Sequence, residues 1–66
     1  MTTYYYELQR IESHGRIIAN DDEKAVLKAR AKETENNKLV LLYKESDTKN
    51  GEPFITVFED KSLPVI

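Results

Sequence analysis

Two segments of the chain are apolar at both odd and even positions, and this pattern limits the folds open to the sequence. They are residues 39–43 (LVLLY) and 54–58 (FITVF). Successive side chains of a strand point to opposite faces of its sheet, so a strand with one buried face alternates apolar and polar residues. The sequence therefore predicts a sheet with two apolar faces, of which one helix can cover only one.

The size of the chain limits how much of it can be buried. With 66 residues it is expected to form one domain over residues 1–66, in which 1–3 and 61–66 are candidates for flexible ends. The sequence contains no Cys, so disulfides and thiolate metal sites cannot brace the fold. Stability must come from packing, and association with a second molecule would add to it.

The pattern along the chain predicts four strands and one helix. Asn20 is a good helix N-cap with Glu23 three residues later, and Asn36-Asn37 is a plausible helix stop. An Asn-Gly turn signal lies in the polar loop 46–53. The predicted strands are 4–11, 16–19, 38–45 and 54–59, and the predicted helix is 21–34. This order favours an α+β ββαββ domain, with a mostly antiparallel four-stranded sheet and one helix packed on one face.

The predicted helix has two candidate faces. Ala25, Val26 and Ala29 fall on one side at about 100° per residue, while Leu27 and Ala31 fall on nearly the opposite side. We expect the small residues to face the sheet and Leu27 to be partly exposed. Leu27 is then either a scattered surface residue or part of an interaction patch, and the reverse packing remains open.

The two doubly apolar strands divide into two sets of side chains. The set expected to face the helix, with Tyr4 or Tyr6 and Ile17 or Ile18, is Leu39, Leu41, Phe54 and Phe58. The set expected on the opposite face, with Tyr5 nearby, is Val40, Leu42, Ile55 and Val57. A slip of one residue in register would exchange the two sets.

The second apolar face needs a cover. The tail with Leu63, Val65 and Ile66 could fold back over it, although Pro64 interrupts that segment. A second copy of the chain could pack on it as a symmetric dimer, or another protein could bind there. An exposed strand edge could also accept a strand from a partner.

Residues suited to catalysis are sparse. The only His is His14, in a predicted turn, and no Cys is present. Asp21, Asp22 and Glu23 resemble a cation site, but capping and the helix dipole account for them. Two Gly residues do not make a phosphate-binding loop. We therefore expect no enzyme activity, no cofactor and no metal site.

The charge balance disfavours a phosphate ligand. The net charge is −2 and the isoelectric point about 5.3, whereas domains that bind phosphates usually carry a basic excess. The Tyr4–Tyr6 cluster could still stack on bases, and candidates for a basic rim are Arg10, Arg16, Lys38 and Lys44. The alternative is that Tyr4 and Tyr6 are core residues and Tyr5 covers the outer face of the sheet.

The sequence favours a small non-catalytic protein–protein interaction module: an adaptor, regulator or inhibitor, acting on another protein or as a homodimer. Its predicted interaction residues are Tyr5, Leu27, Val40, Leu42, Ile55 and Val57. The second hypothesis is a small nucleic-acid-binding or regulatory module, and the third is a minor subunit of an enzyme. Without an apolar run of about 18 residues or a signal sequence, the expected location is the cytoplasm, with no membrane partner.

Overall fold

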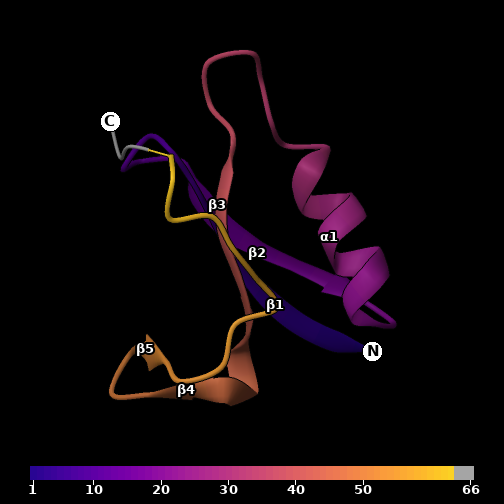
Figure 1. Cartoon of the computed structure of the whole chain (residues 1–66). Coiled ribbons are helices and arrows are strands. Elements are labelled where there is room, and N and C mark those ends of the chain that lie inside the picture. The colour runs from indigo at the N-terminus through magenta and orange to yellow at the C-terminus, as the bar shows by residue number, and fades with distance from the viewer. Residues whose placement is uncertain (64–66) are drawn as a thin grey trace.

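A four-stranded antiparallel sheet with one α-helix on one face forms the body of the molecule (Figure 1). The computed structural model describes residues 1–63. Its elements in chain order are β1 (Thr2–Leu8), β2 (His14–Ala19), α1 (Asp22–Arg30), β3 (Leu39–Lys44), the 3-10 helix η1 (Glu45–Asp47), β4 (Thr48–Lys49), β5 (Glu52–Pro53) and β6 (Phe58–Glu59). The strand order in the main sheet is β2-β1-β3-β6. This confirms the predicted α+β class.

Strands β1 and β2 pair as an antiparallel hairpin. Tyr4 and Leu8 are buried and Tyr6 packs against the core, so the alternation of β1 follows the prediction. β1 ends at Leu8 rather than residue 11, because the chain then turns toward β2: the Leu8 amide donates to the Ser13 carbonyl at 2.8 Å, and the Ser13 amide donates to the Arg10 carbonyl at 2.9 Å. The Gln9 amide donates to the Lys38 carbonyl at 3.0 Å.

Helix α1 begins and ends differently from the prediction. Asp21, rather than Asn20, is the N-cap, and its Oδ1 accepts from the Lys24 amide at 2.8 Å. The helix ends at Arg30, because the next residues make i→i−3 bonds such as Glu33 N to Arg30 O. The Glu33 carboxylate then accepts from the Leu39 amide at 2.7 Å, which ties the end of the helix to the start of β3.

The inner face of α1 is the predicted one. Ala25 and Ala29 are fully buried, and Val26 packs against the core. Leu27 is 63% exposed, so the reverse packing of the helix is wrong. Small side chains on the inner face allow the helix to lie close to the sheet.

The main difference from the prediction is a bulge in β3. Glu7 of β1 pairs with Leu41, but the next residue, Leu8, pairs with Leu39, so two steps along β3 match one step along β1. Leu39 and Leu42 are therefore both in the core, although their positions differ in parity. The prediction was wrong for Leu41, which lies opposite Glu7 on the face away from the helix, and for Leu42, which is fully buried on the helix side.

The predicted fourth strand is mostly irregular. Only Phe58–Glu59 pairs with β3, while Phe54 and Ile55 are 62% and 55% exposed. Phe58 lies opposite Leu42 and packs against the core, as predicted, and Val57 also packs against the core. Phe54 was expected to face the helix, and its exposure contradicts this.

The polar loop before this segment contains a small hairpin. β4 and β5 pair through a turn in which Asn50 and Gly51 both have positive φ, at 55° and 80°. Such values belong to the turn type that the Asn-Gly signal favours. The hairpin projects beyond the end of β3 (Figure 1). Leu63 is the last described residue, and the predicted cover by Val65 and Ile66 lies outside the described residues.

Tyr4 links the buried sheet to the first turn of the helix. Its ring is 1% exposed, and its hydroxyl donates to Asp22 Oδ1 at 2.7 Å. Lys44 Nζ lies 3.7 Å from the same oxygen. Burial, followed by the hydrogen bond to Asp22, raises the pKa of Tyr4 from 10.0 to about 12.

The raised pKa of Tyr4 predicts a loss of stability in alkali. Because the folded state holds this proton more tightly than the unfolded state, the contribution is complete below pH 10 and is lost as the pH rises toward about 12. At about 1.4 kcal/mol per pKa unit, the free energy of unfolding should fall by roughly 2 kcal/mol from this group between pH 8 and pH 11.5, before the full effect is reached above pH 12. Urea unfolding at pH 8 and pH 11.5 should show a smaller fall in the free energy of unfolding for Tyr4→Phe than for the wild type. An equal fall in both proteins would contradict the raised pKa of Tyr4.

Candidate functional site

The face of the main sheet turned away from α1 carries a mixed set of aromatic, aliphatic and charged side chains. Strand register places them in cross-strand rows, because residues that oppose one another point to the same side. The helix-free face comprises the row Arg16, Tyr5, Tyr43, the row His14, Glu7, Leu41, Glu59, and the pair Ile18, Thr3.

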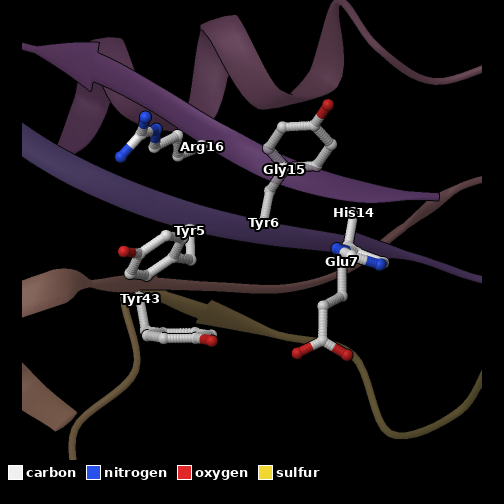
Figure 2. Close-up of a pocket in the computed structure, with 7 residues that line it drawn as sticks. All are labelled: Tyr5, Tyr6, Glu7, His14, Gly15, Arg16 and Tyr43. Carbon is white, nitrogen blue, oxygen red and sulfur yellow. The ribbon is translucent and has the colours of Figure 1, made fainter. Parts of the chain in front are cut away.

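Two tyrosines lie at the centre of the helix-free face. The ring centroids of Tyr5 and Tyr43 are 5.7 Å apart with an interplanar angle of 46°. Figure 2 shows that Arg16, Tyr5 and Tyr43 follow one another across β2, β1 and β3. The Tyr5 hydroxyl donates to Glu45 Oε2 at 2.6 Å, which holds the ring in one orientation.

Both central phenols keep their protons well above neutral pH. The hydrogen bond to Glu45 is the main reason that the pKa of Tyr5 is raised. Burial is the main reason that the pKa of Tyr43 is raised, and the charge of Glu7 adds to it. The site therefore presents neutral aromatic rings with polar hydroxyl groups at neutral pH.

An open hollow of about 520 Å³ lies among these side chains. The residues that line it are Tyr5, Tyr6, Glu7, His14, Gly15, Arg16 and Tyr43. Gly15 opposes Tyr6 across the hairpin, and a Cβ there would lie 2.9 Å from the Tyr6 hydroxyl oxygen. The missing side chain of Gly15 thus leaves room for the Tyr6 ring, which lies on the helix side of the hairpin and packs against the core (Figure 2).

Charges are distributed unevenly over the helix-free face. Arg16 and His14 lie on β2, at one edge of the sheet, and Glu59 lies on β6, at the other. Glu7 lies between them on β1, opposite His14, and no hydrogen bond or ion pair joins the two in the described chain. Together with Glu45 beside Tyr5, these carboxylates stand against the guanidinium of Arg16 on this face.

The structure does not bring the predicted interaction residues together. Tyr5 lies on the helix-free face as predicted, and Leu27 on the outer side of α1. The other four are placed as follows: Val40 is half-buried in the bulge, Leu42 is in the core, Val57 packs against the core, and Ile55 is exposed in the segment before β6. Sequence reasoning missed Leu41 and Tyr43 as neighbours of Tyr5, because the bulge reverses the parity expected for β3.

The Tyr4–Tyr6 cluster is divided between two faces. Tyr4 is buried and Tyr6 packs against the core, so only Tyr5 reaches the helix-free face. Among the basic residues of the nucleic-acid hypothesis, Arg16 lies beside Tyr5, whereas Lys44 turns toward Asp22 on the helix side. The aromatic ring beside Tyr5 on the helix-free face is therefore that of Tyr43 on β3, and not that of Tyr4 or Tyr6.

Comparisons with known proteins add no relative. A scan against protein-family models found no match, and searches of curated proteins and of solved structures found none either. Within residues 1–63, no three or more His, Cys, Asp or Glu side chains are grouped in a way that could hold a metal ion. No helix in that part of the chain is long and apolar enough to cross a membrane.

Proposed function

We propose that this chain is a protein–protein interaction module whose contact surface is the helix-free face. The observation that carries the proposal is the pair of adjacent rings, Tyr5 and Tyr43, on a sheet face that the helix leaves uncovered. Tyr and Arg are enriched among the residues that dominate binding energy at protein interfaces. Arg16 lies directly beside Tyr5 in the same row.

The rigidity of the site supports a binding role. Both rings project from regular strands, and the bond from Tyr5 to Glu45 restrains one of them before any partner arrives. Restraining an aromatic side chain in advance lowers the entropy lost on association. Leu41 and Ile18 add aliphatic surface on either side of the tyrosines.

The charges of the face favour a protein partner over a nucleic acid. Glu7, Glu45 and Glu59 lie on or beside it, and each would repel a phosphate chain. A protein surface can place a Lys or Arg against each carboxylate and an apolar group against the rings. Binding to single-stranded nucleic acid at low salt would be the result that supports the second hypothesis.

Substitution of Tyr43 tests the proposed function. Immobilised wild-type protein and two variants, Tyr43→Ser and Leu27→Ser, would be used to capture proteins from the native host, with bound proteins quantified by mass spectrometry. Loss of a central aromatic anchor typically costs about 2 kcal/mol, or roughly thirtyfold in affinity. Partners should therefore be lost from Tyr43→Ser but retained by Leu27→Ser, whose substitution lies on the outer side of the helix.

Circular dichroism of each variant would show that the fold is kept. Equal capture by Tyr43→Ser and the wild type would contradict a role for the helix-free face. Loss of capture only in Leu27→Ser would move the contact surface to the outer side of α1.

A further inference from the structure

Strand β2 forms one edge of the main sheet and pairs with β1 alone. In an antiparallel pair, residues whose backbone groups bond across the pair alternate with residues whose N–H and C=O point away from it. The Leu8 amide bonds to the Ser13 carbonyl where the hairpin begins to turn. The next residue of β2, His14, therefore points its backbone groups away from β1, and Arg16 and Ile18 do the same.

These outward backbone groups are mostly open. Within residues 1–63, the Ile18 carbonyl is the outward group of β2 that has a partner, because Lys28 Nζ donates to it at 2.6 Å. The amide and carbonyl groups of His14 and Arg16, and the amide of Ile18, are left for solvent. A row of alternating donors and acceptors along an extended strand is complementary to another extended strand.

Most of β2 lacks the protection that is usual at a sheet edge. Natural edge strands are blunted by short length, by Pro, by a bulge or by a Lys side chain. β2 has six residues, contains no Pro and pairs with β1 in an unbroken register. By contrast, β6 at the opposite edge has two residues. Lys28 protects only the Ile18 end of β2, so the part from His14 to Arg16 is the open part.

The side chains along this edge indicate the chemistry of a partner strand. An open hollow of about 530 Å³ is lined by Thr3, Arg16, Ile17 and Ile18. Ile18 is 51% exposed, and Arg16 makes no ion pair in the described part of the chain. Residues that lie opposite each other on neighbouring strands interact directly. The position opposite Ile18 therefore suits an apolar residue, and the position opposite Arg16 suits a carboxylate.

We infer that the β2 edge binds an extended segment of another protein as an added antiparallel strand, with a carboxylate of that segment opposite Arg16 and an apolar residue opposite Ile18. This surface goes beyond the helix-free face of the proposed function, because it uses the backbone of the sheet edge. A second copy of this chain is a poor occupant. If two β2 strands paired antiparallel through all three outward residues, the two Arg16 side chains would lie directly opposite each other, and like charges in that position are destabilising.

A synthetic peptide tests the edge directly. The probe is TVTETVT with blocked ends, which when centred on Arg16 places its Glu opposite Arg16 and its two Val residues opposite His14 and Ile18. Titrated to about 1 mM into isotope-labelled protein, it should shift the amide resonances of these three residues. Their amide hydrogens should exchange quickly in the free chain and more slowly in the complex.

Two altered peptides separate backbone pairing from charge without changing the protein. Methylation of the Glu nitrogen in TVTETVT removes the donor to the Arg16 carbonyl and should weaken binding at least about tenfold. The peptide TVTKTVT should bind about fivefold more weakly than TVTETVT, because its Lys then lies opposite Arg16.

Variants of Arg16 test the same contact from the side of the protein. The Arg16 N–H points away from β1, so Arg16→Pro removes an edge donor without removing a hydrogen bond of the hairpin. Binding of TVTETVT should fall at least about tenfold in Arg16→Pro. It should fall about fivefold in Arg16→Gln, which keeps the N–H but loses the charge. Tyr43→Ser is the control, because Tyr43 lies on β3, away from this edge, and it should bind the peptide as the wild type does.

Several results would overturn the inference. One is a failure of TVTETVT to bind at about 1 mM, and another is binding that N-methylation leaves unchanged. Slow exchange of the Arg16 amide in the free chain would also overturn it, because the edge would then already be paired. Resonance shifts centred on Tyr5 and Tyr43, with loss of binding in Tyr43→Ser, would place the peptide on the helix-free face; the edge is then rejected and the proposed function is supported.

Discussion

Leu42→Ala is expected to destabilise the domain by about 2–5 kcal/mol, whereas Leu41→Ala should cost about 1 kcal/mol or less. Leu42 is fully buried against the helix side, while Leu41 lies on the helix-free face opposite the exposed Glu7. The two residues are adjacent and chemically identical, so the difference between them reports only which side of the sheet each one occupies. A domain of this length has a total stability of roughly 3–10 kcal/mol, so Leu42→Ala should remove a large part of it.

Urea unfolding followed by circular dichroism would measure both variants. The bulge in β3, opposite Glu7 and Leu8 of β1, is what places Leu42 and Leu39 together in the core. If β3 alternated without a bulge from a buried Leu39, Leu41 would be the core residue instead. A larger loss for Leu41→Ala than for Leu42→Ala would therefore contradict the register of β3.

The second large effect is expected at a polar residue. Asn37→Ala should cost about 2–3 kcal/mol, because it removes two hydrogen bonds and leaves a partly buried backbone donor without a partner. Asn37 is only 8% exposed, and its Oδ1 accepts from the Arg10 amide at 3.0 Å. Its Nδ2 donates to Ser13 Oγ at 2.8 Å. The side chain thus joins the loop after β1 to the loop before β3.

Asn36→Ala is the matched control, because Asn36 is the same residue type one position earlier and is exposed. Its loss of stability should stay within about 0.5 kcal/mol, as is usual at the surface. Hydrogen exchange of the Arg10 amide should also become faster in Asn37→Ala than in Asn36→Ala. Equal stabilities and equal exchange in the two variants would rule out the bridging role of Asn37.

The residues that sequence reasoning placed correctly are those whose neighbours are close in the chain. The alternation of β1 depends only on the pleat of one strand, and it made Tyr4 and Tyr6, rather than Tyr5, the candidates for the core. The inner face of α1 depends only on helical geometry, and it assigned Ala25 and Ala29. In each case the pattern repeats within one element, so no knowledge of the partner segment is needed.

The candidate site was predicted only in part, because its composition depends on contacts between distant segments. Tyr5 was placed on the helix-free face by the alternation of β1. Tyr43 and Leu41 were not, because their side depends on a bulge that forms only when β3 pairs with β1. An apolar segment without alternation, such as residues 39–43, offers no local signal for the position of a bulge.

The role of Asn37 also depends on segments that are distant in the chain, so the sequence did not predict it. The sequence marks it as a residue able to end a helix, which is a local property of Asn. In the structure it is instead a buried bridge to Arg10 and Ser13, 27 and 24 positions away. Such a role follows from how two loops meet, and the helix itself has already ended at Arg30.

By itself, the sequence determined the α+β class and the turn at Asn50-Gly51, and it favoured the correct faces of β1 and α1, because each follows from periodicity or from the backbone preference of neighbouring residues. Only the tertiary structure decided the bulge in β3, the shortness of β6 and the grouping of Tyr5 with Tyr43. These features arise when strands far apart in the chain compete for the same core positions, and the register that buries Leu39 and Leu42 together leaves Leu41 and Tyr43 on the helix-free face.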